Sequence, residues 1–320
     1  MTEFLGRYVD HLMTSPFAMA QHSAKIKPIA NDLARRGVLL VASCLRVEVY
    51  GHEHALANLD STIFSGFSAE RIEGAATIIQ RLAEIASGAR SLVLGDNYIS
   101  NQLAKAIELL DPNLPIFQMV RLAIDIGRAS RERQRFIASL NYYHIVRDII
   151  AHRFPNGDLP DRLYVLGADM RVRELIRSGV GERFRSTTIV TRNPKNVRKR
   201  LRAWTDIDVA LTRPAQIGHA REPRSIVVIA GGADINDEYQ AILQSALLRL
   251  EPRTIVDLSH VPVLSKADFV KLNYVTVYDD TFLQAYEQNN KHMAPKLPLL
   301  LSDIEETLRA AQIYLSAKPP

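Results

Sequence analysis

The sequence holds a single cysteine, Cys44, among its 320 residues. A disulfide needs two cysteines and a cysteine-based metal site needs several, so both are excluded within this chain. Cys44 is therefore either a small buried side chain or a reactive thiol, and its neighbours must distinguish the two.

Long apolar runs are also missing. No stretch reaches the roughly 20 apolar residues that a membrane span needs, and the N-terminus lacks the features of a signal peptide. We therefore expect a cytoplasmic protein with no membrane partner. Apolar residues make up 47% and charged residues 23%, which is typical of a globular protein rather than a disordered one.

Positive charge is in slight excess, with a formal net charge of +5. The cations cluster in two runs, residues 128–135 and 195–202. Neither run is interleaved with aromatic residues, as a surface that stacks single-stranded bases would be. Each run is either a solvated helix face or a site of phosphate contact, and both interpretations stay open.

A chain of this length usually forms more than one domain. The segment 155–160 holds two prolines and a glycine and marks a boundary. Before it, helical and alternating patterns predict helices at 23–36 and 139–153 and a strand pair at 38–42 and 46–50. After it, apolar runs that alternate with helical segments predict strands at 163–166, 187–191, 225–230 and 254–257. A last amphipathic helix follows at 303–315.

This pattern predicts an α/β protein in three parts. Residues 1–154 form an α+β catalytic domain with ferredoxin-like strands and helices. Residues 155–300 form a Rossmann-like domain with a doubly wound parallel sheet. Residues 301–320 form the stub of a C-terminal helix.

Cys44 falls in the turn between the first two predicted strands. A thiol acts as a nucleophile only as thiolate, and nearby cations lower its pKa. Arg46 lies two residues further on, and Glu48 shares its strand face and can orient it. These neighbours favour a reactive thiol.

Two blocks of this sequence resemble glutamyl-tRNA reductases. Residues 41–50, Val-Ala-Ser-Cys-Leu-Arg-Val-Glu-Val-Tyr, are similar to the family's Ser-Thr-Cys-Asn-Arg-Thr-Glu-Ile-Tyr block. Residues 86–99, with Gln102 after them, resemble the family's Ala-Ala-Gly-Leu-Asp-Ser-Leu-Val-Leu-Gly-Glu-Pro-Gln-Ile and its downstream glutamine. The likeness extends in order over residues 37–300.

The resemblance implies a reaction. In that family a cysteine attacks the ester of glutamyl-tRNA, and NADPH reduces the resulting thioester to glutamate-1-semialdehyde, the precursor of tetrapyrroles such as porphyrins. By position, Cys44 would be the nucleophile and Arg81 would stand in the place of the family's catalytic histidine. The implied substrate contacts are Ser43, Arg46, Glu48, Ser91, Asp96 and Gln102.

Several positions depart from the family. Leu45 replaces an asparagine, and Asp96-Asn97-Tyr98 replaces Glu-Pro-Gln, so the substrate pocket differs in polarity. Arg81 cannot act as a base, because its pKa stays above about 12. It could lower the pKa of Cys44 or hold an oxyanion.

The nucleotide-binding segment has also changed. The family's Gly-Ala-Gly-Glu-Met-Gly turn is one residue shorter here, from Gly167 to Arg171. The implied cofactor contacts are Gly167, Ala168, Asp169, Met170 and Arg192. Arg192 follows the second strand, where it can accept the 2′-phosphate that distinguishes NADPH from NADH.

Three histidine positions are weaker candidates. His52 and His54 flank Glu53 in a turn, but no further residue completes a metal set, so we assign no metal site. His144 fits a core or interface histidine. His260 follows a strand end, where a role beside the cofactor is open.

Three functions therefore stay open. The first is NADPH-dependent reduction of an aminoacyl-tRNA through a Cys44 thioester. The second is acyl transfer from Cys44 to another nucleophile in a specialised biosynthetic pathway, and the third is non-catalytic binding of tRNA or a partner. Family members continue into a helical dimerisation domain, whereas this sequence ends at Pro320, so we do not expect the family-type homodimer.

Overall fold

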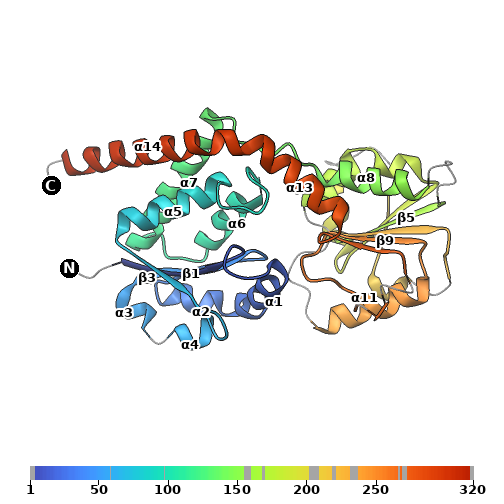
Figure 1. Ribbon diagram of the computed structural model, residues 1–320. Coiled ribbons are helices and arrows are strands. Elements are labelled where there is room, and N and C mark those ends of the chain that lie inside the picture. Colours follow the sequence, from blue (N-terminus) through green and yellow to red (C-terminus); the bar gives the residue numbers. More distant parts are fainter. Residues whose placement is uncertain are drawn as a thin grey trace. The chain divides into compact units, whose positions relative to one another are not determined.

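The computed structural model describes most of the chain. It covers residues 4–57, 59–96, 98–154, 160–167, 170–201, 209–217, 221–230, 237–265, 267–268 and 272–317. These residues divide into two compact units (Figure 1). Unit 1 comprises residues 1–140 and 286–320, and unit 2 comprises residues 141–285. The sequence had put the boundary after residue 154 and set residues 301–320 apart.

Unit 1 is built on a four-stranded antiparallel sheet with the order β2-β3-β1-β4. The strands are β1 (Phe4–Asp10), β2 (Leu39–Ser43), β3 (Arg46–His52) and β4 (Glu70–Glu73). Helices lie between β1 and β2 and between β3 and β4, which is the β-α-β-β-α-β connectivity of ferredoxin-like folds. The predicted fold of the first domain is confirmed.

Side chains that alternate along these strands face two different cores. Leu40, Val47 and Val49 pack with α1 (Pro16–Ile26) and α2 (Ala30–Arg35). Leu39, Val41 and Tyr50 point to the opposite core, which holds the longer helices. These helices are α5 (Ala75–Ser87), α6 (Tyr98–Ile107), α7 (Pro115–Arg133) and α14 (Leu297–Ala317). Two short helices, α3 (Glu53–Leu56) and α4 (Asp60–Ile63), follow β3.

Helices α5 and α7 cross at a glycine. A Cβ atom at Gly127 of α7 would clash with the carbonyl oxygen of Ala83 and crowd Ala86 on α5. The absence of a side chain at Gly127 therefore allows the two helices to approach closely. This crossing fixes α5, which carries Arg81.

The C-terminal segment of unit 1 is tied to its first 140 residues. Asn290 Nδ2 donates to the Leu92 carbonyl over 2.8 Å, and Asn289 Nδ2 donates to the Leu94 carbonyl over 3.0 Å. On α14, Asp303 pairs with Arg133 at 2.7 Å. Residues 92–94 are therefore held by side chains almost 200 positions further along the chain.

Unit 2 is built on a six-stranded parallel sheet with the order β10-β9-β8-β5-β6-β7. The strands are β5 (Arg162–Leu166), β6 (Ser186–Val190), β7 (Ala210–Thr212), β8 (Ser225–Ile229), β9 (Thr254–Asp257) and β10 (Tyr274–Thr276). Renumbered within the unit and taken from the other edge, the order is 3-2-1-4-5-6, that of dinucleotide-binding Rossmann domains. The predicted doubly wound sheet is confirmed.

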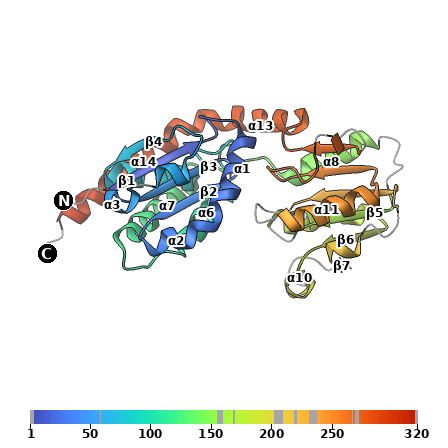
Figure 2. The ribbon, with the colours of Figure 1, turned by 90° about the horizontal axis from the view of Figure 1, so that it is seen from below.

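Helices cover both faces of this sheet (Figure 1). On one face, Leu243, Leu247 and Leu250 of α11 (Asp237–Leu250) pack against alternate residues of the central strands. α8 (Tyr142–Arg153) lies on the other face and contacts α9 (Met170–Arg177). α10 (Pro194–Leu201) lies next to β7 at the sheet edge (Figure 2), and α13 (Asp280–Met293) follows β10.

Two sequence predictions need correction in detail. The helix expected at 23–36 is interrupted, because Pro28 lies in a 3₁₀ turn, Lys27–Ile29, between α1 and α2. The helix expected from 139 begins at Tyr142, where Asn141 caps it through a bond from the Tyr143 N–H. Within the described residues, no helix is long and apolar enough to cross a membrane.

Candidate functional site

Cys44 occupies the tip of a hairpin. Ser43 of β2 pairs with Arg46 of β3, which leaves Cys44 and Leu45 as the two turn residues. The Ser43 hydroxyl accepts a hydrogen bond from the Leu45 N–H at 3.3 Å. The cysteine side chain is half-buried, as expected of a thiol at a turn rather than in a sealed core. Its predicted position at a strand end is correct.

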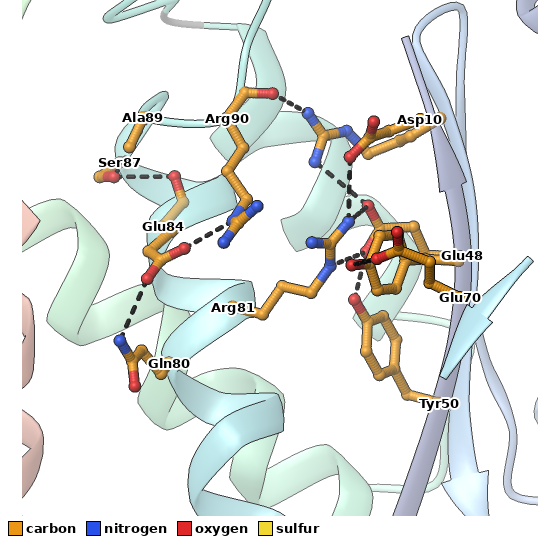
Figure 3. Close-up of polar contacts among 12 residues, drawn as sticks. Asp10, Glu48, Tyr50, Glu70, Gln80, Arg81, Glu84, Ser87, Ala89 and Arg90 are labelled. Carbon is orange, nitrogen blue, oxygen red and sulfur yellow. Dashed lines mark hydrogen bonds and ion pairs between the residues drawn. The ribbon is translucent and has the colours of Figure 1, made fainter. Parts of the chain in front are cut away.

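A buried charged cluster lies on the adjoining strands. Tyr8 and Asp10 of β1 pair across the sheet with Glu48 and Arg46 of β3, so the four side chains share one face. This face looks toward α5, which contributes Arg81 (Figure 3). We call the set Asp10, Arg46, Glu48, Tyr50 and Arg81 the hairpin charge cluster.

Glu48 is the centre of this cluster. Arg81 donates to it twice, from Nη2 to Oε1 at 2.9 Å and from Nε to Oε2 at 3.1 Å. Arg46 Nη1 donates to Oε1 at 3.2 Å, and the Tyr50 hydroxyl donates to Oε2. Burial alone would raise the pKa of Glu48, but the charges of Arg81 and Arg46 outweigh it and hold the pKa below its usual value.

Arg81 is almost as deeply buried as Glu48. Only 4% of Arg81 is exposed, its Nη2 also donates to Asp10 Oδ2 at 3.2 Å, and its guanidinium lies 3.3 Å from the centre of the Tyr8 ring. Two carboxylates therefore balance the charge that the sequence analysis assigned to catalysis. This geometry supports a positioning role for Arg81 more strongly than a direct catalytic one.

Arg46 connects the cluster to a second segment. Its Nη2 donates to the Arg90 carbonyl, in the loop between α5 and α6 that also holds Ser91 and Asp96. At the far end of this loop, Arg131 of α7 donates to the carbonyls of Gly95 and Asp96 at 2.7 and 2.9 Å. The loop is thus held at both ends by arginines, and one of them stands two residues after Cys44.

The predicted substrate residues fall into two groups. Ser43, Arg46 and Glu48 lie on the hairpin, and Ser91 lies one residue from the Arg90 carbonyl that Arg46 contacts; all four are buried. Asp96 is half-buried and accepts a hydrogen bond from the Tyr98 N–H at 2.8 Å. Gln102 is exposed on α6, and no hydrogen bond among the described residues joins it to the charge cluster.

His11 is a neighbour that the sequence analysis missed. Its backbone N–H donates to the Leu45 carbonyl at 2.9 Å, beside Cys44. Its ring is half-buried, and Nδ1 has no hydrogen-bond partner among the described residues. Burial lowers the pKa of His11 and the Arg46 charge lowers it further, against the opposing effect of Asp10. A neutral imidazole can accept a proton. Predicting β1 would have drawn attention to this histidine.

The carboxyl ends of the unit 2 strands form a second candidate region. Gly167 follows β5 with a φ of 123°, a conformation that favours glycine. Ala168 and Asp169 lie outside the described residues, and Met170 begins α9 with its side chain undescribed. Arg192 follows β6, is exposed, and lies with its guanidinium 4.9 Å from the centre of the Tyr239 ring. Gly167 and Arg192 therefore lie at the carboxyl ends of the neighbouring strands β5 and β6.

Asp257 shapes another loop at this edge. It is fully buried at the end of β9, and its carboxylate accepts from the N–H groups of Ser259 and Val263 at 2.8 and 3.0 Å and from the Tyr274 hydroxyl. Burial raises the pKa of Asp257, although these hydrogen bonds oppose the shift. His260 lies in the same loop, where its carbonyl accepts from the Tyr278 hydroxyl at 2.7 Å.

The other histidines named from the sequence, His52, His54 and His144, form no metal site among the described residues. No group of three or more metal-ligating side chains occurs among the described residues. The rings of His52 and His54 stack on each other at 5.6 Å. His144 is exposed, so it does not lie in the core, and its assignment to an interface stays a prediction.

Comparison with known proteins gives one strong match. The chain is 51% identical over 311 residues to protein nfe2 of Rhizobium meliloti, a match that covers 97% of this chain and 100% of that protein. No protein-family model matches the chain.

Solved structures give more distant likenesses. Glutamyl-tRNA reductase from Methanopyrus kandleri matches 98% of this chain and 81% of its own, at 20% identity and a TM-score of 0.49. L-tryptophan dehydrogenase from Nostoc punctiforme matches 76% of this chain and 69% of its own, at 10% identity and a TM-score of 0.37. At these values, such likenesses do not distinguish one activity from another.

Proposed function

This chain belongs to the family of the Rhizobium meliloti protein nfe2, and we propose that it reduces an aminoacyl-tRNA with NADPH through a thioester on Cys44. The observation that carries this proposal is the setting of Cys44. The thiol is half-buried at a hairpin tip, next to Leu45, whose carbonyl accepts a hydrogen bond from the His11 backbone N–H, and a buried arginine, Arg46, lies two residues away.

The charge cluster supports a nucleophilic thiol in an indirect way. Arg46 and Arg81 bear two positive charges, which Glu48 and Asp10 balance, so the cluster contributes rigidity rather than a large net field. Such a network holds the hairpin tip, and with it Cys44, in one position. We expect this fixed position to help the nucleophile more than a net positive charge nearby would. His11 then has the role of accepting the thiol proton.

The first chemical step follows from these residues. The Cys44 thiolate attacks the carbonyl carbon of the aminoacyl ester, a C–S bond forms and the ester C–O bond breaks. The tRNA leaves as its terminal ribose hydroxyl, with the proton that His11 took from the thiol. Cys44 then carries the acyl group as a thioester, which accepts a hydride more readily than an ester does.

The second step needs a hydride donor. When bound, NADPH supplies this hydride. Gly167 after β5 and Arg192 after β6 fit a dinucleotide, because they stand at the positions that approach the pyrophosphate and the 2′-phosphate in this sheet order. Reduction of the thioester carbonyl releases an amino aldehyde and restores the Cys44 thiolate. In glutamyl-tRNA reductases this product serves tetrapyrrole biosynthesis.

A second function is supported by the loop after β5. Its sequence from Gly167 to Arg171 holds one glycine and a carboxylate, Asp169, where a pyrophosphate-binding turn has several glycines. If NADPH does not bind there, the Cys44 thioester passes its acyl group to another nucleophile. The protein is then a tRNA-dependent acyltransferase.

The reductase proposal is tested by mixing the protein with NADPH and tRNA charged with one amino acid at a time. We expect one charged tRNA to cause NADPH oxidation and formation of an aldehyde, and Cys44→Ser to abolish both. His54→Ala, at an exposed position, is the control and should keep both. A Cys44 adduct without NADPH oxidation would support the acyltransferase instead, and absence of both an adduct and NADPH oxidation would contradict both functions.

A further inference from the structure

The two basic runs of this chain have different surroundings. In the first run, Arg128 Nε donates to the Ser100 hydroxyl at 2.8 Å, Arg131 is buried against two carbonyls, and Arg133 pairs with Asp303 at 2.7 Å. This run is therefore partly used inside unit 1. Arg128 and Arg135 stay exposed, and an acidic side chain pairs with Arg133 alone among the described contacts of this run.

The second run lies on α10 and is exposed. Lys195, Arg198 and Lys199 are all exposed, and none forms a salt bridge with an acidic side chain that the structure describes. Lys195 and Lys199 stand four positions apart, so they are neighbours on the helix surface and repel each other. An unneutralised cluster of this kind costs local stability and is typical of a binding surface.

The geometry of α10 collects these cations on one side. A helix turns by about 100° per residue, so the three cations fall within an arc of roughly 100°. Val197 is 3% exposed and lies on the opposite side, where it anchors the helix to unit 2. We call the exposed side, formed by Lys195, Arg198 and Lys199, the α10 cationic face.

We propose that the α10 cationic face binds the phosphate backbone of a structured RNA. Three exposed cations on one helix face can contact the phosphates of a nucleic-acid backbone. The face has no aromatic residue on which single-stranded bases could stack. A lipid surface fits less well, because the apolar side of α10 is already buried against the protein. This inference rests on the proposed function, in which the RNA is the aminoacyl-tRNA.

The test measures binding of a full-length tRNA transcript to the intact protein over a range of salt concentrations. The variant combines Lys195→Gln, Arg198→Gln and Lys199→Gln. The control variant combines Arg35→Gln, Arg147→Gln and Arg309→Gln, which removes the same charge from exposed arginines that pair with acidic residues. Circular dichroism checks that both variants fold.

We expect the α10 variant to bind tRNA roughly 10-fold or more weakly and to lower the salt slope by roughly 2 to 3, because each phosphate contact contributes about 0.9. The control should bind as the wild type does. The proposal would be overturned if both variants lost tRNA affinity equally, if the α10 variant lost none, or if the wild type did not bind tRNA. It would also be overturned if the α10 variant kept tRNA binding and instead lost binding to NADPH or to phosphatidylserine vesicles. The Cys44 adduct, measured separately at saturating tRNA, reports on the proposed function.

Discussion

Glu48 and Arg81 form the closest described ion pair of the hairpin charge cluster, with Oε1 of Glu48 2.9 Å from Nη2 of Arg81. Both side chains are almost completely buried. A buried charge that loses its partner is strongly destabilising, whereas an exposed one is not. The cluster therefore joins α5 to the hairpin that presents Cys44, and several of its properties can be measured.

Removing the Glu48 charge should destabilise the fold. Glu48→Gln leaves two buried arginines without their shared carboxylate, so we expect the free energy of unfolding to fall by about 3–5 kcal/mol. Denaturant titration measures this change. The control is Glu53→Gln, which breaks an exposed pair with Arg71 and should cost less than about 1 kcal/mol. Equal effects of the two substitutions would show that the cluster does not stabilise unit 1.

The same carboxylate should make stability depend on pH. Because the pKa of Glu48 is lowered in the folded protein, its ionised form stabilises the fold above the unfolded pKa of about 4.3. This contribution is lost as the pH falls through the folded pKa. Unfolding free energies measured from neutral to acidic pH should therefore fall less steeply in Glu48→Gln than in the wild type. Glu108→Gln, at an exposed position, should keep the wild-type slope; identical slopes in all three proteins would refute the assignment.

Replacing Gly127 should separate α5 from α7. The added methyl group of Gly127→Ala would meet the Ala83 carbonyl and the Ala86 side chain, and overpacking of this kind costs about 1–3 kcal/mol. Asp125→Ala changes an exposed position of the same helix and should alter stability by less than about 0.5 kcal/mol. Thermal unfolding compares the two, and a fully stable Gly127→Ala protein would disprove the close crossing.

His11 should accelerate acylation of Cys44. If its neutral ring takes the thiol proton, His11→Ala should slow single-turnover acylation by charged tRNA by about 10²-fold or more. In the wild type, the acylation rate should fall at acid pH as His11 becomes protonated. In His11→Ala this fall should be absent, while the affinity for tRNA stays unchanged. A rate equal to that of the wild type would mean that His11 only supports the turn.

Arg192 should select NADPH over NADH. Its guanidinium stands exposed at the end of β6, and loss of a charged contact to a phosphate costs roughly 10-fold or more in affinity. Arg192→Ala should therefore weaken NADPH binding by about that factor and leave NADH binding nearly unchanged. Arg213→Ala, at another exposed position of unit 2, is the control. Equal weakening for both nucleotides would argue against a 2′-phosphate contact.

The sequence predicted those parts of the fold whose pattern is local. Strand β3 alternates polar and apolar residues, and the central strands of unit 2 are short apolar runs between helices, so both were identified. Strand β4 was missed because Glu70–Glu73 is mostly charged, and β1 because Gly6 and Arg7 interrupt its pattern. His11 was missed together with β1.

The sequence predicted where the candidate site lies in the chain, but it did not predict which side chains contact one another there. The hairpin with Cys44 at its tip follows from two adjacent strands. The hydrogen-bonded ion pair of Glu48 with Arg81 joins residues 33 positions apart in the sequence. The hydrogen bond of Asn289 with the Leu94 carbonyl joins residues 195 positions apart. Such contacts depend on tertiary packing. For this reason the sequence assigned Arg81 to catalysis, whereas the structure encloses it between two carboxylates.

The central claim is that the Cys44 sulfur takes an acyl group from a charged tRNA, and intact-protein mass spectrometry tests it most directly. The protein is mixed with aminoacyl-tRNA in the absence of NADPH, the reaction is quenched in acid, and the intact mass of the protein is measured. We predict a mass increase of one aminoacyl group that maps to Cys44, disappears on treatment with hydroxylamine and is absent from Cys44→Ser. An unmodified mass with every charged tRNA would contradict the account.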